Sequence, residues 1–403
     1  MSSVSEFLPA SRIDPFSQAY VDDELVAEEE LRNVGRAVWL PQYKVVALSH
    51  YEDVVPALRD WETFSSARGV GLRDIKAPET LSDPGGVLEL DPPDQTQARR
   101  VYSKVLTREF YEQTRERFRA AADDLITEQL AAGEIDGVQA IATAYPMSVF
   151  PDALGVTAQD RQHLLATGTW TFNSFGPENE PYLSTREAGL AGMNWTLQQG
   201  IPGRCTPEGL VSTLHREGEG KLPASITTTH LGVGLMVAGI DTTITGIAWA
   251  LYFLATQPDQ WAMLKADPTL ARACFEETLR LSSPVRWFAR HTTRDVDIAG
   301  TTIPADTRVM LMIGSANRDP QRWERPVTFD ITRDSKGQIA FGFGVHACVG
   351  AMIARIEAEA VLTALVRRAD QITLVGEPTV VWSNTMRALA SLPMVLTPAP
   401  SVL

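Results

Sequence analysis

Cysteine is scarce in this chain of 403 residues, and the few cysteines present form no disulfide or zinc pattern. The three residues, Cys205, Cys274 and Cys348, lie far apart, and none belongs to a CxxC pair. This distribution argues against a structural zinc site and against a disulfide-stabilised fold, and it fits a reducing compartment. We therefore expect a cytoplasmic protein.

An excess of positive charge is also missing. The chain has 36 Lys and Arg against 50 Asp and Glu, a formal net charge of −14. Nucleic acids and anionic membrane surfaces attract basic proteins, so neither is an expected partner. No basic segment followed by an apolar run opens the sequence, which argues against a signal peptide. The longest apolar stretch, 231–255, contains Asp241 and therefore indicates a buried helix instead of a membrane span.

Internal repeats and a regular alternation of strands and helices are absent, which argues against repeat and α/β architectures. Apolar periodicity predicts helices at 22–35, 51–60, 95–133, 140–154, 160–171, 183–215, 224–257, 258–265, 267–282 and 350–369. Short strands are expected at 37–41, 44–49, 296–298, 301–303, 308–313, 373–375 and 394–397, and a long loop at 65–90. We expect a single, mainly α domain with minor β-structure over 1–403, a loose tail at 1–12, and a central helix of about 30 residues.

One segment combines glycine, aromatic residues and a cysteine directly before an expected helix. Its sequence is FGFGVHACVG, residues 341–350. Glycine lets a backbone turn tightly and approach a flat ligand closely, and the amides at a helix N-terminus stabilise a thiolate. Cys348 is thus a candidate ligand of a soft or redox-active metal. A glycine-rich turn with an inert buried cysteine explains these ten residues equally well.

Two further motifs have ordinary explanations when each is taken alone. Glu277 and Arg280, in ETLR, share one helix face with a spacing that is usual for solvated ion pairs. In AGIDTT, residues 238–243, a threonine hydroxyl can bond the carbonyl four residues earlier, and Gly239 adds slack, so the helix can bulge or kink. Ordinary buried threonines and a capping aspartate would also account for that segment.

Together these segments resemble the cytochrome P450 family. FxxGxxxCxG is similar to the family's haem-thiolate loop, ETLR to its ExxR motif, FDITR (329–333) to the loop that adds a third charged partner, and AGIDTT to its acid–alcohol segment. With NRDP (317–320) and DPP (91–93), the resemblance extends over nearly the whole chain. It implies the cytochrome P450 fold, a triangular prism of helices with a long central helix and small β-sheets.

The resemblance also implies roles for individual residues. Cys348 would be the axial ligand of a haem b, with Phe341 in the same loop. Asp241 would feed protons to the reaction, and Thr242 would hold the oxygen species at the iron. A fold-locking group beneath the haem would consist of Glu277, Arg280 and Arg333. The haem propionates would be contacted by Arg99, Arg290, His346 and Gln95, the last at a position where the family commonly has histidine.

Several stretches further resemble bacterial P450s that O-demethylate para-methoxybenzoate, among them YPMSVFPD (145–152), FNSFGP (172–177) and SNTMR (383–387). An aromatic substrate would be enclosed by edge-to-face contacts. The matching pocket residues are Phe172, Phe175, Val237, Ala238, Val285 and Phe288.

The carboxylate anchor of that group is largely missing from this chain. Its matching positions hold Ser82, Gly85, Val233 and Gly234. Burying a carboxylate without partners costs several kcal/mol, so the head group of the substrate is expected to be neutral. Three cations nearby in the sequence could replace the anchor, namely Arg68, Arg73 and Lys76.

The expected function is that of a haem-thiolate monooxygenase acting on a small aromatic substrate, by O-demethylation of a methoxyarene or hydroxylation of an alkyl-arene. No reductase domain or iron–sulfur cysteines are visible, so a separate ferredoxin or flavodoxin and an NAD(P)H-dependent reductase would supply electrons to a monomer. Their docking surface would include Arg99, Arg100, Lys104 and Arg355. The alternatives are a peroxide-driven peroxygenase and a haem-binding sensor without turnover; Asp241 and Thr242 argue against both.

Overall fold

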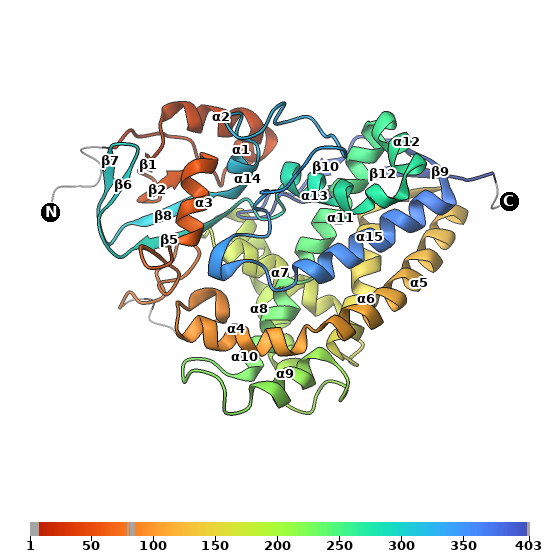
Figure 1. Cartoon of the computed structure of the whole chain (residues 1–403), viewed down its shortest axis with the longest axis horizontal. Coiled ribbons are helices and arrows are strands. Elements are labelled where there is room, and N and C mark those ends of the chain that lie inside the picture. Colours follow the sequence, from red (N-terminus) through yellow and green to blue (C-terminus); the bar gives the residue numbers. More distant parts are fainter. Residues whose placement is uncertain (1–7, 79, 81–84, 401–403) are drawn as a thin grey trace.

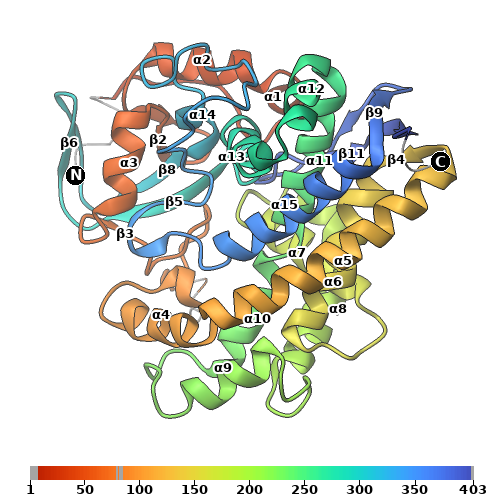
Figure 2. The same cartoon turned by 45° about the vertical axis from the view of Figure 1, so that its right-hand side comes forward.

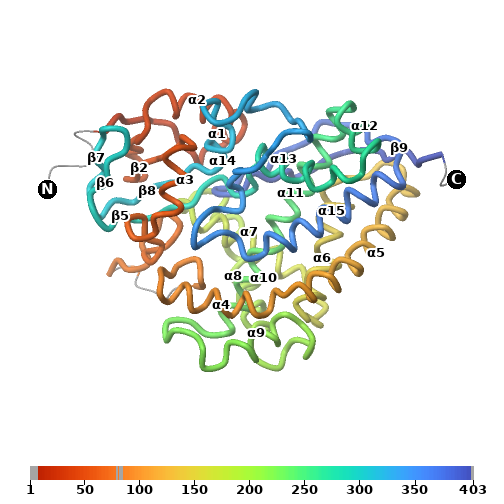
Figure 3. The backbone as a smooth tube through the Cα atoms, viewed as in Figure 1, coloured from red at the N-terminus to blue at the C-terminus, as the bar shows by residue number. Residues whose placement is uncertain are grey.

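Helices form most of the chain, and the largest sheet lies to one side of them (Figure 1). The computed structural model describes residues 8–78, 80 and 85–400, so Ser82 lies outside the described part. The two ends of the described chain lie at opposite ends of the long axis (Figure 3). The fold is mainly α with minor β, as the sequence predicts.

The longer helices end close to the predicted positions, but several are divided. Their bounds are α1 (Gln18–Asp22), α2 (Glu24–Val34), α3 (Tyr51–Arg59), α4 (Asp94–Val105), α5 (Arg108–Ala132), α6 (Ala144–Leu154), α7 (Gln162–Ser174), α8 (Glu180–Gly200), α9 (Leu210–Gly218), α10 (Thr228–Ala238), α11 (Asp241–Thr256), α12 (Pro258–Ala266), α13 (Ala271–Ser282), α14 (Ile313–Asn317) and α15 (Ala351–Arg368). Shorter turns are η2 (Val87–Glu89), η3 (Val138–Thr143), η4 (Pro268–Leu270) and η5 (Gly344–His346). The helix expected at 95–133 is two helices, because the Thr107 hydroxyl accepts a hydrogen bond from the Phe110 amide and starts α5 anew.

A five-stranded sheet has the order β1-β2-β8-β5-β3. The strands are β1 (Val38–Leu40), β2 (Val45–Leu48), β3 (Phe64–Ser65), β5 (Trp287–Thr292) and β8 (Arg308–Met312). β2 and β8 are parallel, and the other pairs are antiparallel. The sequence did not predict β5, because the buried Arg290 and His291 interrupt the apolar run that is typical of a central strand.

Three smaller sheets complete the β-structure. They consist of β4 (Glu134–Asp136) with β12 (Pro393–Pro398) and β9 (Ala369–Leu374), of β6 (Val296–Ile298) with β7 (Thr301–Ile303), and of β10 (Thr379–Val380) with β11 (Leu389–Ser391). β4, β10 and β11 were not expected, since two or three residues give no alternating pattern. β9 begins at Ala369, directly after α15, and not at Thr373.

The N-terminal segment is fixed where the structure describes it, so the expected loose tail is wrong for residues 8–11. Trp39 donates its amide to the Pro9 carbonyl at 2.8 Å, and the Ser11 amide donates to the Trp39 carbonyl at 3.0 Å. Leu8 is buried. The segment thereby extends the edge of the sheet beside β1.

The central helix expected at 224–257 starts later and is divided into α10 and α11, which cross the middle of the molecule (Figure 2). It starts at Thr228 because Thr227 and His230 form a capping box. The helix is interrupted at Gly239 and Ile240. Residues 228–256 are long and apolar enough to span a bilayer by length and composition, yet 61% of their most apolar window is buried inside the protein. That burial is typical of a core helix.

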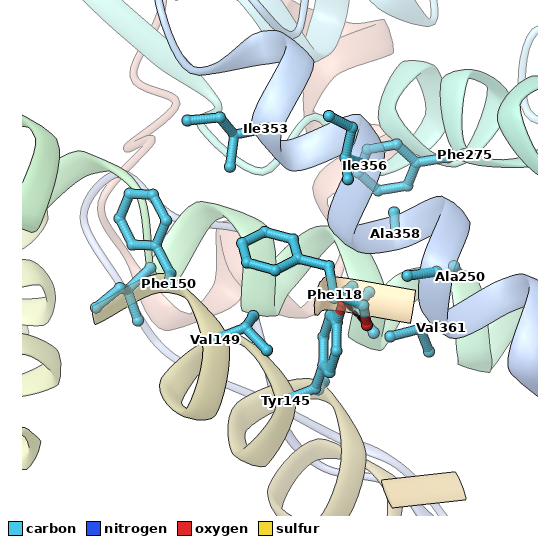
Figure 4. Packing of buried hydrophobic residues seen from close by; sticks show 14 of the residues in the cluster. Phe118, Tyr145, Val149, Phe150, Ala250, Phe275, Ile353, Ile356, Ala358 and Val361 are labelled. Atoms are coloured by element: carbon cyan, nitrogen blue, oxygen red, sulfur yellow. Dashed lines mark hydrogen bonds between the residues drawn. The ribbon is translucent and has the colours of Figure 1, made fainter. Parts of the chain in front are cut away.

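The largest core cluster joins the central helix to the helices around it (Figure 4). Phe118 of α5, Tyr145 and Phe150 of α6, and Phe275 of α13 are all buried there. The Tyr145 hydroxyl donates to the Phe118 carbonyl at 3.0 Å. This packing fixes α15, which follows the Cys348 loop, against the central helix.

Candidate active site

Cys348 lies between η5 and the first turn of α15. Its amide donates to the Phe341 carbonyl at 2.8 Å, which closes the loop. Burial raises the pKa of the Cys348 thiol, and the amides of Gly350 and Ala351 and the charge of Arg99 act in the opposite direction. The residue nevertheless has exposed surface. The amides at the start of α15 therefore face the sulfur, as the sequence predicts. The exposed surface of Cys348 leaves the sulfur accessible to a metal ion.

Two glycines of this loop have a left-handed backbone conformation, and one of them contacts helix α3. Gly342 and Gly344 both have a φ of 70°, which disfavours other residues. A Cβ atom on Gly344 would lie 2.6 Å from the Leu58 carbonyl oxygen of α3. Gly344 thus lets the end of α3 contact the loop.

Each of two aromatic residues of the loop makes a cation–π contact with an arginine. The Arg59 guanidinium lies 4.3 Å from the centre of the Phe343 ring. The Arg355 guanidinium lies 4.5 Å from the centre of the Phe341 ring and also bonds Glu276. Cation–π contacts of this kind orient the rings and stiffen the loop around Cys348.

Arg99, Arg290 and His346 form a cluster of donors beside Cys348. Burial lowers the pKa of Arg290 to about 10, and burial followed by repulsion from Arg290 and Arg99 lowers the pKa of His346 to about 3. Arg290 donates only to the Ala289 carbonyl among the described residues, and His346 Nε2 is buried without a described partner. Asp91, the acid nearest to Arg290, accepts from Ser65 and Ser66.

Buried cations without bonded acids are costly and call for an anionic partner. A group with two carboxylates, such as the propionates of haem, has the charge and the acceptors that this cluster lacks. The donors present therefore fit haem.

Gln95 is buried and joins α4 to the Cys348 loop, because its side-chain amide donates to the Val345 carbonyl at 2.5 Å. The expected contact of Gln95 with a propionate would need the second N–H of this amide.

Asp241 and Thr242 begin α11, directly after the interruption of the central helix. The Thr242 hydroxyl donates to the Ala238 carbonyl at 2.8 Å, as the sequence predicts. The Asp241 carboxylate accepts a hydrogen bond from the Thr169 hydroxyl of α7 at 3.1 Å. Burial raises the pKa of Asp241 to about 7, so the carboxyl group can both carry and release a proton near neutrality. Thr169 was not among the predicted site residues, because it lies 72 residues from Asp241 and no motif links the two.

Three of the expected pocket residues are phenylalanines that meet edge to face. The Phe172 and Phe175 ring centres are 6.0 Å apart with an interplanar angle of 88°, and those of Phe175 and Phe288 are 6.0 Å apart at 63°. Val285 and Met386 complete one apolar cluster with them. Met386 was not among the predicted contacts, because its pairing with Val285 joins segments 101 residues apart.

The remaining two pocket candidates lie outside this cluster, on the last turn of α10. Val237 is half-buried, and Ala238 is exposed although its helix runs through the core. Ala238 also provides the carbonyl that accepts from Thr242. The end of α10 therefore lies beside Asp241 and Thr242.

Of the three cations that could replace the carboxylate anchor, Arg68 is already paired with acids. Arg68 bonds Asp74 at 2.8 Å and also pairs with Asp306, while Arg73 and Lys76 are exposed. Of the matching anchor positions, Val233 is buried against Gly200 of α8, where a Cβ atom would be only 2.6 Å from Val233 Cγ2.

The other two matching positions are no better suited to hold an anion. The Gly85 amide donates to the Glu89 carboxylate at 2.7 Å, which brings negative charge to this loop. A Cβ atom on Gly234 would lie 3.4 Å from the Tyr102 hydroxyl oxygen. Neither glycine has a side chain that could contact a carboxylate.

Glu277 and Arg280 form a fully buried ion pair that the partly exposed Arg333 joins, unlike the solvated pair that the motif alone suggests. Arg280 donates twice to Glu277, at 2.8 and 2.9 Å, and Arg333 donates to it at 2.9 Å. Arg280 also donates to the Asn317 and Pro326 carbonyls, at 2.9 and 2.7 Å. The network thereby fastens α13 to the later segment 317–333.

The expected basic surface for a redox partner is only partly available. Arg100 and Lys104 of α4 are exposed, whereas Arg355 is paired with Glu276, and burial lowers the pKa of Arg99.

A surface cavity of about 410 Å³ lies beside α15 and was not predicted from the sequence. It is lined by Arg108, Tyr111, Glu112, Arg115 and Met352.

Comparison with known proteins agrees with this geometry. A family model described as Cytochrome P450 matches residues 210–374. The cytochrome P450 CYP199A2 of Rhodopseudomonas palustris is 43% identical over 393 residues, which cover 97% of this chain and 95% of that protein. The cytochrome P450 monooxygenase PikC of Streptomyces venezuelae is 35% identical over 76% of this chain and 75% of its own length.

Solved structures agree with the sequence relatives. The cytochrome P450 CYP109Q5 from Chondromyces apiculatus has a TM-score of 0.80 with this chain at 28% identity, covering 97% of this chain and 99% of the other. The extended match in sequence and the match in fold lead to the same assignment. The chain belongs to the cytochrome P450 family, whose enzymes are oxidoreductases that bind haem through a cysteine thiolate.

Proposed function

We propose that this enzyme oxidises a small, neutral aromatic substrate, by O-demethylation of a methoxyarene or hydroxylation of an alkyl-arene. The observation that carries the proposal is the edge-to-face set of Phe172, Phe175 and Phe288. Edge-to-face geometry is the preferred contact of benzene rings, so a further ring gains more from such a set than an alkyl chain does. Val285 and Met386 extend the apolar wall.

The charges around the pocket support a neutral head group. Arg68 is engaged by Asp74 and Asp306, and Val233 and Gly234 offer no donor side chain. A carboxylate that entered would lose its hydration without gaining a charged partner, which costs several kcal/mol. A methoxyphenol or a dimethoxybenzene avoids that cost.

Haem would be held by Cys348 at its iron and by Arg99, Arg290 and His346 at its propionates. When bound, it supplies the reduction of dioxygen by two electrons and the transfer of one oxygen atom to a C–H bond. Oxygenation of a methoxy carbon gives a hemiacetal, which breaks into a phenol and formaldehyde; the second oxygen atom and two protons leave as water.

The side chains of the protein would supply the protons for the reaction. Asp241, whose pKa is raised to about 7 by burial, can pass a proton inward at neutral pH and regain it from solvent. Thr242 lies next to it at the start of α11, and its hydroxyl is held by the Ala238 carbonyl at 2.8 Å. This pair favours dioxygen chemistry over the peroxygenase and sensor alternatives.

Electrons would come from a separate ferredoxin or flavodoxin and its NAD(P)H-dependent reductase. Arg100 and Lys104 are exposed on α4, and α4 is joined to the Cys348 loop through Gln95. An acidic partner that docks there would approach the haem from the side of its thiolate ligand. We further propose that the enzyme works as a single-domain monomer in the cytoplasm.

The test is a side-by-side titration of the holoenzyme with para-substituted arenes that differ only in a carboxylate or a neutral group. We expect para-methoxyphenol to shift the haem spin state at a concentration about one to two decades below that of para-methoxybenzoate. Turnover of the better ligand should release one formaldehyde per phenol. Tighter binding of the carboxylate would contradict the neutral head group, and spin shifts only with long alkyl compounds would contradict the aromatic substrate.

A further inference from the structure

We infer that Thr169 of α7 is a positioning residue for the reaction, which holds the Asp241 carboxyl group in the orientation from which it delivers protons. The inference rests on the proposed role of Asp241. It adds a residue from a different helix to the acid–alcohol pair of α11.

The contact between the two helices is close and specific. The Thr169 hydroxyl donates to Asp241 Oδ2 at 3.1 Å, and it is the only side chain of the described chain that bonds this carboxylate. The preceding residue is Gly168, where a Cβ atom would lie 2.8 Å from the same oxygen. The carboxyl group therefore rests on the backbone of α7, in space that only glycine leaves free, with one hydroxyl to orient it.

No charge of the described chain influences the Asp241 carboxyl group. Apart from Asp241, the titratable residues of α7, α10 and α11 are His163, His230 and Tyr252, and the Tyr252 ring packs on Trp249. His163 packs on Trp195, and His230 caps the start of α10; neither influences the pKa of Asp241. Burial raises that pKa, and the hydrogen bond from Thr169 is the one described contact that lowers it.

A hydroxyl suits a carboxyl group that changes its protonation state. It donates to the carboxylate and, after rotation, accepts from the protonated acid. A lysine or arginine in its place would favour only the charged form and would lower the pKa far below neutrality. Thr169 can thus keep Asp241 in one orientation through both halves of a proton transfer.

The same helix also contacts the ring pocket. Phe172 follows Thr169 by three residues, so both lie on one face of α7. The Phe172 carbonyl accepts from the Thr385 hydroxyl at 2.6 Å, which anchors this turn.

The experiment compares Thr169→Val, which keeps the shape but removes the hydroxyl, with Thr169→Ser, which restores it. Thr171→Val is the matched control, because the Thr171 hydroxyl on the same helix bonds only the Thr167 carbonyl. The readout is the infrared carbonyl stretch of protonated Asp241 in the purified holoenzyme, identified by its loss in Asp241→Asn and titrated against pH.

We expect Thr169→Val to raise the apparent pKa of Asp241 by about half to one pH unit, since hydrogen bonds to a charged acceptor are the stronger ones. Thr169→Ser and Thr171→Val should titrate like the wild type. In turnover, Thr169→Val should consume NAD(P)H with less product per electron pair while its affinity for the arene stays the same, and Thr169→Ser should recover the product yield.

An unchanged Asp241 titration in Thr169→Val would overturn the inference, even if Asp241→Asn abolishes product formation. A normal product yield in Asp241→Asn would instead overturn the proposed proton relay, and the role of Thr169 with it. The infrared titration needs no aromatic substrate, so a wrong substrate class would not change its result.

Discussion

Gly239 and Phe150 are in such close contact that a Cβ atom on Gly239 would lie 2.4 Å from Phe150 Cε1. The Phe150 ring of α6 thus occupies the space beside the interruption of the central helix. The interruption makes Asp241 the first residue of α11. The Phe150 ring of α6 therefore packs directly before Asp241 and Thr242.

Substituting this glycine should be costly although alanine favours helices. Gly239→Ala should lower the free energy of unfolding by about 1–3 kcal/mol, because the ring must move out of a packed core. Thermal or urea unfolding measures the effect. In Gly234→Ala, on the same helix, the new Cβ would contact only the Tyr102 hydroxyl at 3.4 Å, so that variant should be nearly neutral. An equal loss of unfolding free energy in Gly239→Ala and Gly234→Ala would contradict the importance of the contact with Phe150.

The buried ion-pair network at α13 should respond strongly to the loss of one charge. Glu277→Gln leaves the fully buried Arg280 and the partly exposed Arg333 without their shared acid, which we expect to cost about 3–5 kcal/mol of unfolding free energy. The matched control is Arg272→Gln, which removes one exposed charge from a 3.4 Å pair with Glu359 and should change stability by less than about 1 kcal/mol. A loss at Glu277 no larger than in the control would show that the network is not a fold lock.

Glu357 of α15 should make stability depend on pH. It is fully buried, neither carboxylate oxygen has a described partner, and burial raises its pKa well above the usual value. The folded state therefore keeps a proton that the unfolded chain releases, so stability falls as pH rises above about 4.5. Glu357→Gln should remove this slope, and urea unfolding between pH 5 and 8 measures it. Parallel slopes in the two proteins would show that Glu357 does not titrate in this way.

Electron transfer should depend on the exposed cations of α4. Lys104→Glu should slow reduction at limiting ferredoxin, and the remaining rate should fall as salt is added, because long-range attraction is screened. Arg12→Glu makes the same change of charge on the exposed N-terminal segment and should leave the rate unchanged. If reduction is indifferent to both salt and Lys104→Glu, the partner docks elsewhere.

Residue spacing alone could predict only local geometry; the contact of Arg333 with Glu277, 56 residues away, was expected from the family resemblance. Three local features each lie within ten residues, so residue spacing was enough to predict their geometry. They are the Cys348 loop, the Glu277–Arg280 pair and the bond from Thr242 to Ala238. Contacts between distant segments left no such pattern. Gln95 and Val345 are 250 residues apart, and Thr169 and Asp241 are 72 apart. The interruption of the central helix at Gly239 and Ile240, in contrast, lies within the AGIDTT segment, whose glycine and threonines already indicate a bulge or kink.

The most direct test of the account concerns Cys348 as the haem ligand. The reduced carbonyl complex of the wild type should show the Soret band that is diagnostic of a thiolate ligand. Cys348→Ala should lose this band, whereas Cys205→Ala and Cys274→Ala, which change the two buried cysteines, should keep it. Retention of the thiolate band in Cys348→Ala, or its loss in either control that still folds and binds haem, would contradict the assignment.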